Sequence, residues 1–152
     1  MSAPRIAQDR PGAILSPGAA SRAEEWRQSV YVDYRGPLVS TNAAYKKTRT
    51  GQFYMSPEGK AFKMALAFAA RGAMQGRPPF AGPVSVMVDF WFRSAANDVD
   101  GPLKLVLDSL EGQVFTNDRQ VVHVSAAKHI SDEPKMVGLS LTVKQVPNED
   151  DP

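Results

Sequence analysis

The residues most able to do chemistry are two carboxylates that stand two positions apart, Asp98 and Asp100. In extended backbone, side chains two positions apart project to the same side, so these two can converge. Carboxylates held that close repel each other, and a shared proton or a metal ion relieves the repulsion. Because Mg²⁺ binds one or two carboxylates and accepts phosphate oxygens, the pair predicts a magnesium site beside a phosphate.

Two further residues could complete this site. Lys104 follows Asp100 by four positions and can point back toward the carboxylates, and Asp118 precedes a predicted strand that could carry it beside them. Structural alternatives stay open, because Asp100 also suits a helix cap and Asp118 also suits a turn. Lys104 also suits a surface ion pair with Asp100 or Asp108.

The elements that must position these residues predict an α+β domain, in which a mixed β-sheet has two helices packed on it. Apolar and β-branched residues indicate strands at 30–34, 84–92, 121–127 and 137–146, and the alternation of apolar and polar residues is clearest in 84–92. Two short extended pieces flank Arg49-Thr50-Gly51, which indicates the tip of a hairpin. The acidic pair therefore lies between a strand and the helix that follows it.

Two helices are expected from their start signals and apolar stripes. Ser56 and Pro57 suit the cap and the first position of a helix that ends near Met74, with a buried face made of Phe62, Ala65, Leu66, Ala69 and Ala73. A second helix is expected at 102–111, capped by Asp100 or Gly101, with a buried face made of Leu103, Val106, Leu107 and Leu110.

Charge is unevenly distributed along the chain, although the net charge is only +2. Residues 29–83 carry eight positive and two negative side chains, whereas residues 84–147 carry six positive and eight negative ones. A basic surface beside an acidic cluster suits a protein that binds a polyanion and presents a metal ion to it, although chance clustering explains the charge pattern equally well. The residues expected to contact DNA phosphates are Lys46, Lys47, Arg49, Lys60, Lys63 and Arg71.

Composition limits the domain organisation and the setting. The 152 residues suit one domain, expected at 29–147, with a disordered or loosely ordered tail at 1–28 and an acidic tail at 148–152. The absence of cysteine excludes disulfides and thiolate metal sites. No apolar stretch reaches 18 residues and no secretory signal is evident, so we expect a cytoplasmic protein that does not enter a membrane.

Several motifs follow one another in an order that is typical of a known family. Asp98-Val99-Asp100 is followed by Lys104, by an apolar helix, and by Asp118-Arg119-Gln120-Val121-Val122. In this order the chain resembles the RusA family of Holliday-junction resolvases, small enzymes often carried by prophages. The resemblance implies that Asp98, Asp100 and Asp118 bind the metal and that Lys104 is essential. The family commonly has Asn after the second Asp, where this chain has Gly101.

The sequence and this resemblance together predict a Mg²⁺-dependent, structure-selective DNA endonuclease. It would resolve four-way junctions by paired nicks in DNA recombination and repair, and it would act as a homodimer because one chain supplies one acidic cluster. Three alternatives are a nuclease for other branched DNA, a DNA-binding module of the same fold without catalysis, and a generic Mg²⁺- or RNA-binding protein.

Overall fold

The computed structural model of the chain describes residues 28–147. The two expected tails, at 1–28 and 148–152, therefore lie outside the described residues except for Gln28. None of the helices in residues 28–147 is long and apolar enough to cross a membrane.

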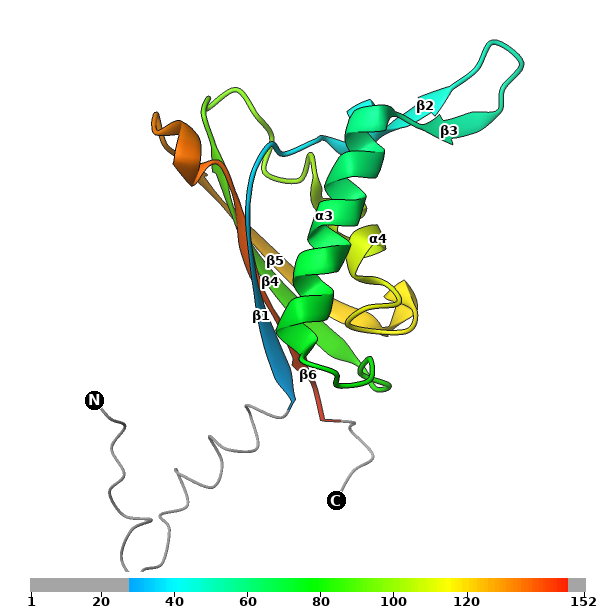
Figure 1. The fold of residues 1–152 in the computed structure, drawn as a ribbon, viewed down its shortest axis with the longest axis vertical. Coiled ribbons are helices and arrows are strands. Elements are labelled where there is room, and N and C mark those ends of the chain that lie inside the picture. Colours follow the sequence, from blue (N-terminus) through cyan, green and yellow to red (C-terminus); the bar gives the residue numbers. More distant parts are fainter. Residues whose placement is uncertain (1–27, 148–152) are drawn as a thin grey trace, which may run out of the picture.

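A four-stranded mixed sheet forms the centre of the fold, as predicted (Figure 1). The strands lie in the order β1-β6-β4-β5, in which β4 and β5 are parallel and the other neighbours are antiparallel. Their bounds are Ser29–Arg35 for β1, Val84–Phe92 for β4, Val121–Ile130 for β5 and Gly138–Gln145 for β6. The predicted strand at 84–92 has the bounds of β4, and the strand predicted at 121–127 extends three residues further.

Two helices cover one face of this sheet, α3 (Pro57–Met74) and α4 (Leu103–Leu110), as Figure 1 shows. Alternate side chains of β4 point into the core beneath them, from Val84 to Phe92, and all five are buried. The opposite face of the sheet is open, since Tyr31 and Met87 on it are 61% and 57% exposed. The predicted α+β arrangement of two helices on a mixed sheet is confirmed.

Helix α3 begins as predicted, because the Ser56 side chain accepts a hydrogen bond from the Gly59 N–H at 3.1 Å and Pro57 occupies the first turn. Its predicted buried face is correct only in part. Phe62 and Leu66 are buried, whereas Ala65 is exposed and the stripe continues through Ala70 and Met74. The buried residues therefore recur every four positions. The large side chains Phe62, Leu66 and Met74 determine which face of the helix turns inward, because an alanine side chain is too small to do so.

A short segment that was not predicted precedes the hairpin. Helix α2 (Thr41–Ala44) is capped by the Ser40 hydroxyl and leads directly into strands β2 (Tyr45–Lys47) and β3 (Phe53–Met55). These two strands form the predicted hairpin, which projects away from the sheet at the start of α3 (Figure 1). Helix α2 is thereby placed next to the loop that follows β4.

Candidate active site

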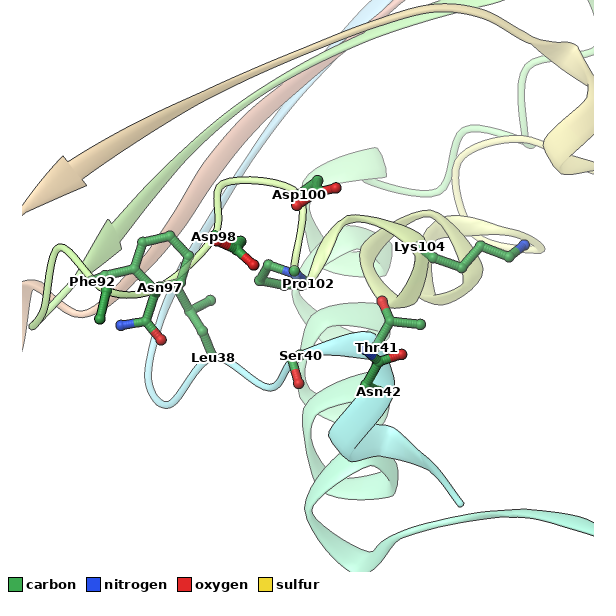
Figure 2. Close-up of a pocket in the computed structure, with 12 residues that line it drawn as sticks. Leu38, Ser40, Thr41, Asn42, Phe92, Asn97, Asp98, Asp100, Pro102 and Lys104 are labelled. Atoms are coloured by element: carbon green, nitrogen blue, oxygen red, sulfur yellow. The ribbon is translucent and has the colours of Figure 1, made fainter. Parts of the chain in front are cut away.

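A pocket of about 560 Å³ opens between the loop after β4 and the segment around α2. One wall comes from residues 92–104 and the other from residues 38–42, as Figure 2 shows. The lining residues are Leu38, Ser40, Thr41, Asn42, Phe92, Ala96, Asn97, Asp98, Asp100, Gly101, Pro102 and Lys104. The acidic pair and Lys104, both selected from the sequence, therefore border one pocket.

The acidic pair is exposed and unpaired. Asp98 and Asp100 both line the pocket, and within residues 28–147 neither side chain has a hydrogen bond or an ion pair with another residue. Two neighbouring carboxylates without protein partners suit Mg²⁺, which prefers oxygen ligands and completes its shell with water and phosphate. The chemistry of these donors therefore fits a divalent cation.

The loop that carries the pair is tied to its surroundings through backbone carbonyl groups. Thr41 donates its N–H to the Gly101 carbonyl at 2.7 Å, and its hydroxyl accepts the Leu105 N–H at 3.3 Å. From β5, the Lys128 ammonium donates to the carbonyls of Ala95 and Asn97 at 3.0 and 2.8 Å. Neither anchor was evident from the sequence, because contacts to carbonyl groups leave no pattern of residue types.

The start of α4 differs from the prediction. The cap position is occupied by Pro102, which makes no side-chain capping bond, so neither Asp100 nor Gly101 caps the helix. Asp100 contributes only its carbonyl, which accepts the Leu103 N–H at 3.1 Å. Its carboxylate is thus not used by the helix and remains available at the pocket.

Lys104 points away from the acidic pair and toward two other carboxylates. Its ammonium donates to Oδ1 of Asp108 at 2.9 Å and to Oδ2 of Asp118 at 3.2 Å. The hydrogen bond to Asp108, followed by the one to Asp118, raises the pKa of Lys104 above its usual value. The alternative in which Lys104 pairs with Asp108 is confirmed, although Asp108 is only 19% exposed, and the same ammonium also contacts a second predicted site residue, Asp118.

Asp118 does not line the pocket. It starts a short 3-10 helix, η2 (Asp118–Gln120), in front of β5, and its N–H donates to the Glu111 carboxylate at 2.9 Å. Asn117 caps this turn and Asp118 is its first residue, in agreement with the alternative that Asp118 is a turn residue. Within residues 28–147 no group of three acidic or histidine side chains lies close enough to hold a metal ion. Asp118 is connected to the site through Lys104.

Comparison with protein families identifies the chain. A family model described as endodeoxyribonuclease RusA matches residues 36–138, which is more than half of the sequence. The chain belongs to the RusA family. The match covers the hairpin, both pocket walls, Lys104 and Asp118. No curated protein matches the chain significantly.

Members of the RusA family are DNA endonucleases that act on Holliday junctions, and in general they depend on a divalent metal. This chain has Gly101 directly after Asp100, where the resemblance described from the sequence implies Asn. A Cβ atom at Gly101 would lie 3.2 Å from the Asp98 carbonyl oxygen and 3.8 Å from the Ser40 Cβ. An asparagine at this position of the RusA chain would therefore fit only after a shift of the loop by a few tenths of an ångström.

The basic residues selected from the sequence lie on two surfaces of this RusA domain. Lys46, Lys47 and Arg49 are exposed on the projecting hairpin, where the Lys47 ammonium lies 5.5 Å from the ring centre of Phe53. On α3, Lys60 and Arg71 are exposed and Lys63 is half-buried. Arg71 also donates to the Gln113 side chain at 3.1 Å. All three basic side chains of the hairpin are exposed, whereas on α3 one of the three, Lys63, is half-buried.

Proposed function

We propose that this chain is a Mg²⁺-dependent endonuclease that resolves four-way DNA junctions by paired nicks during recombination and repair. The observation that carries the proposal is the pair of exposed carboxylates, Asp98 and Asp100, which line one pocket and have no partner among residues 28–147. A RusA-family domain and a basic hairpin that begins three residues after the pocket residue Asn42 support it. We expect the protein to act on DNA in the cytoplasm.

Each of these residues would have a separate role in the proposed reaction. Asp98 and Asp100 would hold the cation, with Asp118 as the third expected ligand, and Mg²⁺ would lower the pKa of a bound water and stabilise charge on the leaving oxygen. The Lys104 ammonium would offset negative charge on the scissile phosphate. Six basic side chains would bind backbone phosphates and so position the strand without reading its sequence. They are the expected DNA contacts Lys46, Lys47, Arg49, Lys60, Lys63 and Arg71.

A homodimer would supply the second active site. A four-way junction is approximately two-fold symmetric and needs two nicks, whereas one chain carries one acidic pair beside its pocket. A two-fold dimer places two equal sites in related positions. Light scattering at cleavage concentrations should therefore give twice the mass of the chain.

The test is cleavage of a synthetic four-way junction with and without Mg²⁺, using wild type, Asp100→Asn and the control Asp132→Asn. Asp132 is exposed and lies outside the pocket. We expect Asp100→Asn to cut at least about 100-fold more slowly, because charge stabilisation by a bound metal is worth several kcal/mol. Its junction binding should be retained, and Asp132→Asn should behave as wild type.

Linear, flap and fork DNAs complete the panel. Equal cutting of all forms would replace junction resolution with cleavage of branched DNA in general. If the protein binds the junction but does not cut it in the presence of Mg²⁺, the remaining interpretation is a DNA-binding module of the RusA fold. A preference for an RNA duplex would contradict a DNA substrate.

A further inference from the structure

A network of side chains beside the pocket involves residues to which no role in the reaction has been given. The Tyr45 hydroxyl donates to Oδ2 of Asp108, while the Lys104 ammonium donates to Oδ1 of the same carboxylate at 2.9 Å. Lys104 also donates to Asp118 at 3.2 Å. Asp108 is therefore bound at both oxygens, by a group from β2 and by a group from its own helix.

The contact between Lys104 and Asp108 differs from an ordinary pair on the surface of a helix. An exposed pair at this spacing stabilises a helix only weakly, because both side chains keep moving in water. Here the Asp108 side chain is only 19% exposed, compared with 37% for Asp118 and 57% for Lys104. The Tyr45 hydroxyl fixes the orientation of this shielded carboxylate, so that its second oxygen faces the ammonium.

Tyr45 is suited to remain a hydrogen-bond donor at neutral and mildly alkaline pH. Burial, and then the hydrogen bond to Asp108, raise the pKa of Tyr45 to about 12. The tyrosine is also the first residue of β2, directly before Lys46 and Lys47 of the basic hairpin. The base of the hairpin is thus connected to Lys104 through one carboxylate.

We propose that Tyr45 and Asp108 are positioning residues, which together hold the Lys104 ammonium beside Asp118 at the border of the acidic pocket. Because Lys104 also lines that pocket, an ammonium without Asp108 would be drawn toward the unpaired Asp98 and Asp100 and would compete there with a cation. The inference rests on the proposed function, since it concerns the geometry of the same reaction.

Two pairs of variants test it. Asp108→Asn and Tyr45→Phe remove the charge and the hydroxyl, and their controls are Asp132→Asn and Tyr31→Phe, which make the same chemical changes at exposed positions outside the pocket. Single-turnover cutting of a saturated junction should fall about 10-fold or more for Asp108→Asn, the usual loss when the partner of an active-site group is removed. The cutting rate of Tyr45→Phe should fall by about 3-fold to 10-fold for the same reason.

Further measurements separate positioning from a purely structural effect. The junction Kd should stay within about two-fold of wild type, since Asp108 is not expected to touch DNA. In a Lys104→Ala background, Asp108→Asn and Tyr45→Phe should each change the remaining rate by less than about two-fold, because residues that act through a common group are not additive. Thermal unfolding identifies any variant that is merely destabilised, and Tyr45→Phe, which keeps its ring, remains informative if Asp108→Asn folds poorly.

The outcomes of these experiments are distinct. Wild-type rates for Asp108→Asn and Tyr45→Phe, in an enzyme that cuts junctions, would overturn this inference and leave the proposed function intact. A weaker junction Kd with an unchanged saturated rate, or a full additional loss in the Lys104→Ala background, would also overturn it. If the wild type shows no Mg²⁺-dependent cutting, both proposals fall.

Discussion

Replacing Gly59 by alanine should disturb the pocket from a distance. A methyl group at Gly59 in α3 would lie 2.7 Å from the Ala44 Cβ and 2.9 Å from the Ala44 Cα. Carbon atoms in contact stand about 3.5–4.0 Å apart, so α2 would have to move by roughly 1 Å. Ala44 is completely buried, and its methyl group cannot move away by changing rotamer.

The cost follows from two opposing effects. Overpacking a core position destabilises a protein by about 1–3 kcal/mol, whereas alanine in a helix is better than glycine by up to about 1 kcal/mol. We therefore expect Gly59→Ala to lower the free energy of unfolding by about 1–2 kcal/mol and Tm by about 2–8 °C. Activity should fall further, because α2 carries Thr41, which contacts the Gly101 carbonyl at 2.7 Å. A misplacement of about 1 Å in an active site can slow catalysis by about 100-fold.

The assay combines urea unfolding with single-turnover cutting of a four-way junction. The control is Gly72→Ala, the same substitution in the same helix, where a Cβ atom would meet nothing within 4 Å. Gly72→Ala should raise stability by about 0.5–1 kcal/mol and leave the cutting rate unchanged. A Gly59→Ala variant as stable and as active as wild type would refute the claim that close packing of α2 on α3 positions the pocket wall.

Three further predictions concern other parts of the molecule. Gly138→Ala should lower the free energy of unfolding in urea by about 3 kcal/mol or more, because its φ of 147° is strained for alanine and a Cβ would lie 2.1 Å from the Tyr34 carbonyl oxygen. The pKa of Tyr45 is raised from 10.0 to about 12, so the unfolded chain loses this proton first and the free energy of unfolding falls as pH rises through that interval. Tyr45→Phe should remove this contribution to the pH dependence of the free energy of unfolding, which urea unfolding at several pH values between 10 and about 12 would measure. Lys47→Ala and Arg49→Ala should each reduce the slope of log K against log salt for duplex binding by roughly 0.9, and unchanged slopes would exclude phosphate contacts at the hairpin.

Strands could be predicted where one face is buried and the other is not. In β4 the alternation of buried and less buried side chains fixes both ends, because each inward residue from Val84 to Phe92 is in the core. The edge strand β5 gave a weaker signal, since among the described strands it pairs only with β4 and most of its side chains are exposed. Its last residues, up to Ile130, are extended because they pair with the end of β4, which is a tertiary effect.

The acidic half of the pocket was predictable and the opposite wall was not. Asp98 and Asp100 can be recognised by residue type and spacing, whereas α2 has only four residues, too few for a periodic pattern. Tertiary contacts hold it, among them the hydrogen bond from the Ser56 N–H to the Ala44 carbonyl at 2.7 Å. A helix this short is not stable alone, so its position depends on the completed fold.

Lys104 shows why a spacing of four residues can be assigned to the wrong partner. The lysine has an aspartate four positions before it, Asp100, and another four positions after it, Asp108. Only residues within a helix face each other at this spacing, and α4 starts at Leu103, after Asp100 and before Asp108. The start of the helix therefore directs the ammonium toward Asp108, from where it reaches Asp118. Within the described part of the chain this choice leaves Asp98 and Asp100 without an ion pair, as the proposed binding of a cation at the pocket requires.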